Sequence, residues 1–184
     1  CIVISSTGKH FCAGMDLAHF MFENKNLAYA DFSDAWLWQS SFLGSNLHGA
    51  TFDRAAMPQG NLGRTNLTDA SLRATGLSDM TLAWADASRA DFTGADISHT
   101  TLYEGTFLDA DFTDASLRGS DVSDLTTFAG ATLTRADFSE TTRGGIPFMP
   151  PNRSVEATSA AGKAVSWPAP GSIPGVTGGG CDHV

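Results

Sequence analysis

A large apolar residue recurs at every fifth position over most of this chain. The series runs from Leu27 to Val122 with Ala87 as its one small member, and a small residue such as Ala30 or Ala35 stands two positions before almost every member. A helix needs apolar spacings of three and four, and a half-buried strand needs alternation, so neither element produces a period of five. The pattern predicts a chain that turns a corner once in every repeat.

The repeat divides the chain of 184 residues into three segments. Residues 1–25 lack the clean repeat and are predicted to form an N-terminal cap, with an apolar strand at 1–6 and a short helix over 16–23 capped by Asp16. Leu17 and Phe22 also keep the phase of the repeat, so an alternative is that the first coil begins before Leu27. Residues 26–140 are the repeat array, in which one inserted residue near Leu125 resets the phase.

Residues 141–184 are rich in proline and glycine. Such a composition buries too little apolar surface to offset the entropy of ordering it, so we expect a largely disordered tail. Its first apolar residues, Ile146, Phe148 and Met149, are expected to fold back over the open end of the array, since an uncapped end exposes the core.

The repeat carries a family signature: A-D-F-S-D at 30–34, A-D-F-T-G at 90–94, A-D-F-T-D at 110–114 and A-D-F-S-E at 136–140. These motifs resemble the pentapeptide-repeat family, whose consensus is A(D/N)LXX. The resemblance implies an all-β fold, a right-handed quadrilateral parallel β-helix with four repeats in each coil and about six coils. Residues twenty apart then stack, as in the column Phe32, Phe52, Leu72, Phe92 and Phe112. Because the inward side chains fill the tube, we expect any function at its outer faces, ends or flanking segments.

The formal net charge of −9 argues against binding to nucleic acid or to an anionic membrane, and it favours a basic protein partner or simply solubility. The candidate partner-binding acidic face consists of Asp86, Asp91, Asp96, Glu104, Asp109, Asp111, Asp114, Asp121 and Asp124. Stacking by twenty places Asp91 over Asp111, whereas Asp69, Arg89 and Asp109 alternate as an ion-pair ladder. The competing interpretation is that aspartate at the second repeat position accepts hydrogen bonds from turn amides. The family resemblance implies a more specific role, mimicry of DNA in binding DNA gyrase or topoisomerase IV.

Two tryptophans, Trp36 and Trp38, flank the inward Leu37 and are predicted to point outward. They form either an aromatic patch for a partner or a surface that packs beneath the N-terminal segment.

Residues 2–17 resemble the strand, loop and helix start of the crotonase superfamily. The resemblance implies that Ala13, Gly14 and Met15 correspond to an oxyanion-hole loop, with the backbone N–H of Met15 as one donor. A thioester carbonyl needs two convergent donors as well as carboxylates for proton transfer, and the chain has no second donor loop. We therefore expect a relic that serves as an end cap, and a truncated crotonase-like acyl-CoA hydratase is the alternative.

No cofactor or metal site is expected, because Cys181 and His183 lack further ligands. The three cysteines give no disulfide framework and favour a reducing, cytoplasmic location, and no apolar run has the length of a membrane span. The start at Cys1 rather than methionine is taken to indicate a truncated gene product. The sequence thus predicts a non-enzymatic protein-interaction rod, with a structural scaffold as the alternative, and leaves the oligomeric state open.

Overall fold

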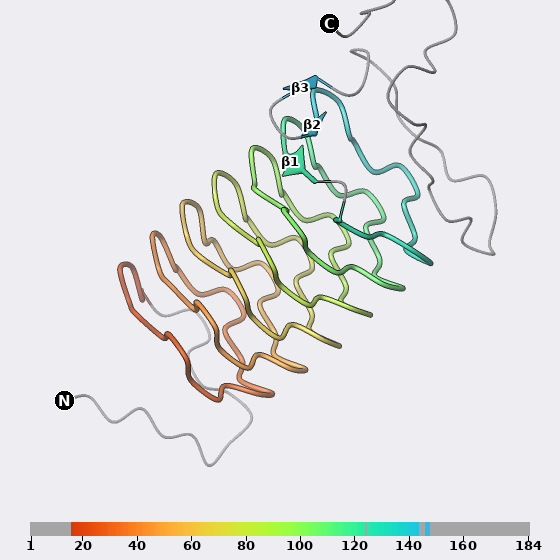
Figure 1. The fold of residues 1–184 in the computed structure, drawn as a ribbon. Coiled ribbons are helices and arrows are strands. Elements are labelled where there is room, and N and C mark those ends of the chain that lie inside the picture. Colours follow the sequence, from red (N-terminus) through yellow and green to blue (C-terminus); the bar gives the residue numbers. More distant parts are fainter. Residues whose placement is uncertain (1–15, 124, 144–145, 148–184) are drawn as a thin grey trace, which may run out of the picture.

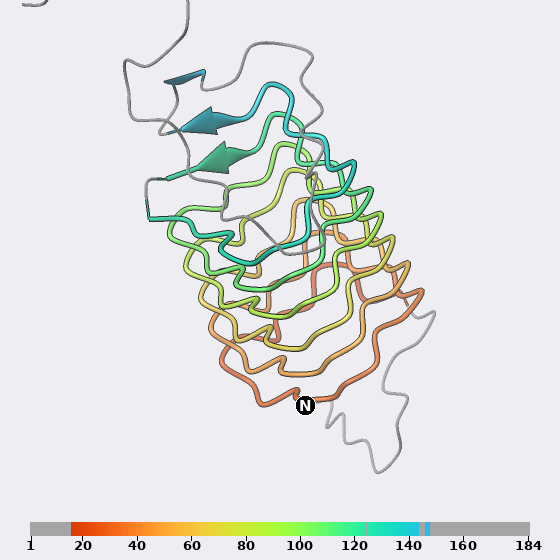
Figure 2. The same cartoon turned by 90° about the vertical axis from the view of Figure 1, so that its right-hand side faces the viewer.

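The computed structural model describes residues 16–123, 125–143 and 146–147. The chain winds in successive coils that stack along one axis, from the N-terminal end of the described part to its C-terminal end (Figure 1). Viewed from the side turned by 90°, corresponding stretches of successive coils lie one above another (Figure 2). The described part is therefore a rod, and its coils follow one another along the axis in the order of the sequence.

Parallel β-bridges join residues twenty apart, which is four five-residue repeats. Asp31 bridges Thr51, Trp36 bridges Ala56 and Asn46 bridges Asn66. Along each bridge the backbone bonds alternate, as when Leu37 N–H donates to the Ala56 carbonyl at 2.7 Å and Ala56 N–H donates to the Ala35 carbonyl at 3.0 Å. The four-repeat coil predicted from the sequence is confirmed, and four series of bridged residues define four faces of the rod. The expected number of coils stays a prediction.

A tight turn follows most of the inward residues. The Ala35 N–H donates to the Phe32 carbonyl at 3.1 Å, and the turn residue Asp34 has a φ of 59°. A positive φ at the third residue is what a type II turn requires. At Gly49, an added Cβ would lie 2.7 Å from the ring of Tyr29, so a larger residue there requires that ring to move.

The inward residues form a continuous core. Phe32 and Phe52 stack with ring centroids 4.9 Å apart, as Phe92 and Phe112 do at 4.8 Å, which matches the spacing of neighbouring strands. These four side chains are completely buried. The predicted phenylalanine column is confirmed.

Small polar residues share the interior with the apolar column. Thr75 Oγ1 donates to the Phe52 carbonyl at 2.8 Å, and Thr100 Oγ1 donates to the Leu77 carbonyl at 2.7 Å. In the described residues no buried side-chain nitrogen or oxygen lacks a hydrogen-bond partner. The described interior is thus filled by side chains whose polar atoms are hydrogen-bonded, so we look for a functional site on the outer surface.

The helix predicted over residues 16–23 is wrong. Asp16 bridges Trp36 and Met21 bridges Ser41, while Leu17 and Phe22 are buried in the core, so these residues form part of a coil. The phase of the repeat, and not the local capping signal at Asp16, decides the conformation, because coil formation buries both apolar side chains. The alternative that the first coil begins before Leu27 is confirmed. The strand predicted at 1–6 lies outside the described residues.

The insertion near Leu125 lengthens one coil by a residue. Thr101 bridges Asp121 across twenty positions, but Thr106 bridges Thr127 across twenty-one. Leu125 is 69% exposed. The extra residue is therefore taken up as a local bulge, and the later residues keep their inward or outward direction.

Three short strands close the described part at its C-terminal end. Strand β1 (Asp121–Val122) pairs in parallel with β2 (Thr142–Arg143), and β2 pairs antiparallel with β3 (Ile146–Pro147). Figure 2 shows β1 and β2 as neighbouring arrows at this end. Order therefore continues past residue 140, where the tail is predicted to begin, and the backbone reverses direction between β2 and β3. The expected roles of Phe148 and Met149, and the disorder predicted for the rest of the tail, concern residues outside the described part.

Candidate interaction surface

Aspartates at the second repeat position have a local structural role. The Asp91 carboxylate accepts the backbone N–H of Thr93 at 2.9 Å, and Asp111 accepts that of Thr113 at 2.8 Å. Asp86 and Asp96 accept from Ser88 and Ser98 in the same way, each at 3.1 Å. These hydrogen bonds tie each carboxylate to the turn of its own repeat. The interpretation that these aspartates satisfy turn amides is confirmed.

The predicted acidic face is not a single face. Asp91 bridges Asp111 on one face, whereas Asp86 is bridged to Asn66, Asp96 to Gly76 and Asp121 to Thr101. These bridges belong to four different series, because the acidic residues follow one another along the coil and not along the rod axis. The carboxylates therefore surround the C-terminal half of the rod, and their role in binding stays a prediction.

Arginines neutralise some of these carboxylates. Arg89 donates to Asp69 through two guanidinium nitrogens at 2.7 Å, and Arg73 lies 3.2 Å from Asp91. Arg135 forms a similar two-pronged pair with Asp114. The hydrogen bonds from Arg89 and Arg135 lower the pKa of Asp69 and of Asp114. The predicted Asp69–Arg89 pair is thus present, with both partners largely exposed.

Other carboxylates have no arginine partner. Among the described residues, none of the ion pairs within 4.0 Å includes Asp86, Asp96, Glu104, Asp109 or Asp111. All five belong to the predicted acidic set and lie between residues 86 and 111. Asp86 and Asp109 still interact electrostatically with Arg89 beyond ion-pair distance. We therefore consider Asp96, Glu104 and Asp111 the carboxylates most available to a cationic partner.

Asp121 differs from these, because its carboxylate is held inside a small polar cluster. The Tyr103 hydroxyl and the Thr142 hydroxyl each donate to it at 2.6 Å. The bond to Asp121 raises the pKa of the Tyr103 phenol. Asp121 thus helps to fasten β1 to β2, and it is better placed to stabilise the end of the rod than to meet a partner.

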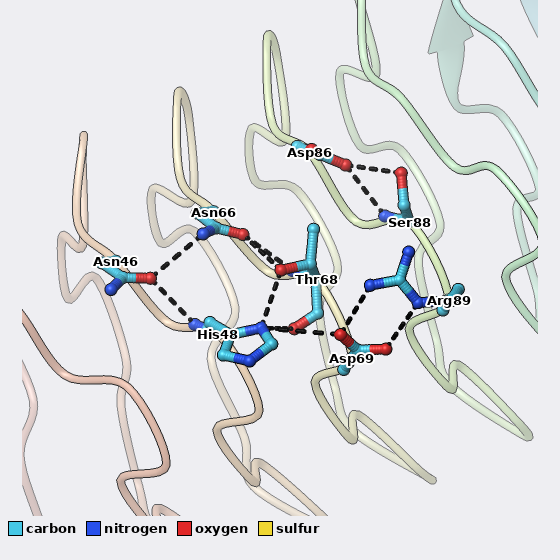
Figure 3. A network of polar contacts seen from close by, with 8 residues as sticks. All are labelled: Asn46, His48, Asn66, Thr68, Asp69, Asp86, Ser88 and Arg89. Carbon is cyan, nitrogen blue, oxygen red and sulfur yellow. Dashed lines mark hydrogen bonds and ion pairs between the residues drawn. The ribbon is translucent and has the colours of Figure 1, made fainter.

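A polar network that was not predicted from the sequence covers the face of Asp86 (Figure 3). Asn66 Nδ2 donates to Asn46 Oδ1 at 3.2 Å, and Asn46 Nδ2 donates to Asn26 Oδ1 at 3.0 Å. His48 Nδ1 contacts the Thr68 carbonyl at 3.0 Å and its hydroxyl at 2.9 Å. The sequence does contain a signal for the stacked asparagines, because Asn26, Asn46 and Asn66 stand twenty residues apart.

The predicted aromatic residues point outward to different extents. Trp36 is 47% exposed, whereas Trp38 is half-buried and meets the His19 ring edge-on at 4.8 Å. A second exposed tryptophan, Trp84, was not predicted, and the Arg64 guanidinium lies 5.1 Å from its ring centroid. The outward direction predicted for the first pair is confirmed for Trp36.

The family model for pentapeptide repeats matches eight copies in this chain, over residues 26–64, 65–103, 90–124 and 109–142. Together these ranges cover more than half of the sequence. The chain belongs to the pentapeptide-repeat family. Members of this family fold as right-handed β-helices, in agreement with the bridges described above.

Several solved structures are similar to this chain at low sequence identity. HetL, a protein of the cyanobacterium Nostoc involved in the regulation of heterocyst differentiation, is 21% identical, with 72% of each chain covered and a TM-score of 0.35. A thylakoid-lumen protein of Arabidopsis thaliana is 26% identical, with 70% of this chain and 68% of that chain covered and a TM-score of 0.32. QnrB1, a plasmid-mediated fluoroquinolone resistance protein, is 16% identical, with coverage of 73% and 79% and a TM-score of 0.46. A search of the curated proteins found no significant match.

The remaining predicted sites of this pentapeptide-repeat protein cannot be placed. Ala13, Gly14 and Met15, the residues of the crotonase-like loop, and Asp124 of the acidic set lie outside the described residues. Within the described ranges no group of three or more histidine, cysteine, aspartate or glutamate side chains could hold a metal ion. The same ranges contain no apolar helix of membrane-spanning length.

Proposed function

We propose that this protein is a non-enzymatic interaction rod whose C-terminal half binds a protein with a basic surface. One observation carries the proposal. The interior is closed by completely buried side chains, whereas the carboxylates without an arginine partner project from the outside between Asp86 and Asp111. A surface of one charge sign attracts partners of the other sign and speeds their encounter.

A type II topoisomerase is the more specific partner that we propose, because its DNA-binding surface is basic and the family resemblance implies DNA mimicry. Asp91 and Asp111 are directly stacked on one face, where two like charges repel each other unless a cation lies nearby. Arg73 reaches Asp91 only. A partner lysine or arginine beside Asp111 would relieve this repulsion.

The test is inhibition of DNA gyrase supercoiling by the purified full chain at micromolar concentrations. We expect inhibition by the wild type, and a several-fold weaker effect when both Asp91→Asn and Asp111→Asn are introduced. Asparagine retains the side-chain oxygen that accepts the Thr93 and Thr113 amides, so the charge is removed while the turns keep their hydrogen bonds.

The matched control is Asp31→Asn, because Asp31 occupies the same face at the N-terminal end and accepts the Ser33 amide at 2.9 Å. This variant should inhibit as the wild type does. Absence of inhibition by the wild type rejects the topoisomerase, and equal loss in the control variant rejects the localisation to the C-terminal half.

A further inference from the structure

One stretch of the rod surface carries no charge. We define the neutral face as Trp36, Trp38, Ala56, Pro58 and Gly76, which lie on one side of three successive coils. Trp36 bridges Ala56, and Ala56 bridges Gly76, so a large exposed ring stands beside two small residues. The neutral face differs from the other uncharged stretches of the rod by its two tryptophans.

The composition of the neutral face favours an uncharged occupant. Tryptophan is the residue type most often found at binding hot spots, and covering an uncharged surface desolvates no ionised group. The carboxylates of the same bridge series, Asp16 and Asp96, lie at its two ends, and the exposed Asp79 borders it on the third coil, three residues after Gly76. A charged segment placed here would meet repulsion or lose its hydration, whereas an apolar one would gain contact area.

The chain itself contains a segment of matching chemistry. Residues 164–181 include no charged side chain, and they hold Trp167, Pro168, Pro170 and Pro174. Proline-rich sequences favour the polyproline II conformation, and surfaces lined by aromatic rings recognise that conformation. The N-terminal residues 1–15 match less well, because Lys9 lies among them.

The described part ends close enough for this segment to reach the neutral face. Asp137 lies one repeat before β2 and belongs to the same bridge series as the neutral face. Toward the N-terminal end of the rod, this series passes through Ser116, Asp96, Gly76 and Ala56 to Trp36. Five steps of about 4.8 Å give a descent of about 24 Å. The nineteen residues between Pro147 and Trp167 span up to about 60 Å when extended. The connection is thus long enough even after crossing the width of the rod.

We propose that the uncharged proline-rich segment 164–181 docks on the neutral face of the same chain. Trp36 and Trp38 supply the aromatic surface, and Ala56 and Gly76 leave room beside it. The contact is independent of the acidic partner site, because it involves a different part of the surface and no charge.

The test records indole N–H resonances of the full chain by two-dimensional NMR, assigned with single Trp→Phe variants. Substituting Trp167→Ala, Pro168→Ala, Pro170→Ala and Pro174→Ala together should shift the resonances of Trp36 and Trp38. The resonance of Trp84 should stay in place, since that ring lies beside Arg64 away from the neutral face. These substitutions lie outside the described β-helix, so they leave its core intact.

The reciprocal variant Trp36→Ala should shift the Trp167 resonance, and the matched control Trp84→Ala should not. Unchanged Trp36 and Trp38 resonances in the tail variant overturn the proposal. So does a shift produced instead by Ile2→Ser with Ile4→Ser, which would assign the surface to the N-terminal segment. A shift that depends on protein concentration would assign the contact to a second copy, and this too contradicts the proposal.

Discussion

Positive φ angles at residues other than glycine are a recurring local cost of this fold. The third turn residue adopts φ between 52° and 63° at positions as different as Ala74, Trp84 and His19. For residues with a Cβ the left-handed region costs about 1–2 kcal/mol. Polar residues at this position offset part of the cost through ion pairs between coils, but an alanine cannot.

We therefore predict that Ala74→Gly raises the free energy of unfolding by up to about 1 kcal/mol, because glycine adopts φ > 0 without the Cβ penalty. Chemical denaturation monitored by circular dichroism measures the change. Ala70→Gly is the control, since Ala70 is buried and is not among the residues of positive φ. It should lower the stability, and a gain in both variants would contradict the explanation.

Buried hydroxyls are the second residue-scale feature. We predict that Thr75→Val destabilises the protein by about 1 kcal/mol, since valine has the same shape but cannot donate to the Phe52 carbonyl. The midpoint of urea unfolding tests this. Thr51→Val, at a half-buried outward position, should change the midpoint much less. Equal effects at the two sites would show that the hydrogen bond contributes nothing.

At the scale of the coil, charged side chains connect one turn to the next. The pairs Asp34–Arg54 and Asp69–Arg89 join residues twenty apart, so the sequence spacing is enough to predict them. Arg73–Asp91 and Arg118–Glu140 join residues eighteen and twenty-two apart. Such diagonal pairs depend on side-chain rotamers, which a repeat pattern does not specify, and for that reason the sequence does not predict them.

These ladders predict a stability that depends on pH. Hydrogen bonds from arginine lower the pKa of Asp34, Asp69, Asp114 and Glu140 in the folded state. A depressed carboxyl pKa adds stability that is present above the unfolded value of about 4 and is lost as pH falls through the folded value. Thermal melting should therefore move to lower temperature below about pH 4. Asp114→Asn should melt with a smaller dependence on pH, and an identical dependence would contradict the assignment.

The bulge after β1 predicts a position that tolerates deletion. Removing Leu125, which is exposed, restores a coil of twenty residues, so we expect a folded protein with little change in melting temperature. Removing Thr113 from a coil that already has twenty residues should be strongly destabilising, because it places later side chains on the wrong side of the chain. Circular dichroism of both variants gives the comparison.

At the scale of the whole molecule, the period of five predicts a chain that turns once in every repeat, and the family resemblance adds the four repeats of each coil and hence the columns. The core from Phe32 to Val122 follows from the period together with the four-repeat coil, because each inward position then has an equivalent twenty residues away. The helix predicted over 16–23 does not form, because the burial of Leu17 and Phe22 in the first coil outweighs the local capping signal at Asp16. The division of the acidic residues among four faces follows from the same geometry, since neighbours in sequence lie on adjacent sides.

The antiparallel strand at the C-terminal end has a consequence for assembly. A parallel ladder that ended with β2 would offer free amides and carbonyls on which a second rod could grow in register, as protofilaments do in amyloid. Strand β3 occupies this edge with its direction reversed, and Pro147 has no amide hydrogen to donate. On this side of the rod, β3 therefore blocks the end-to-end addition of a second rod.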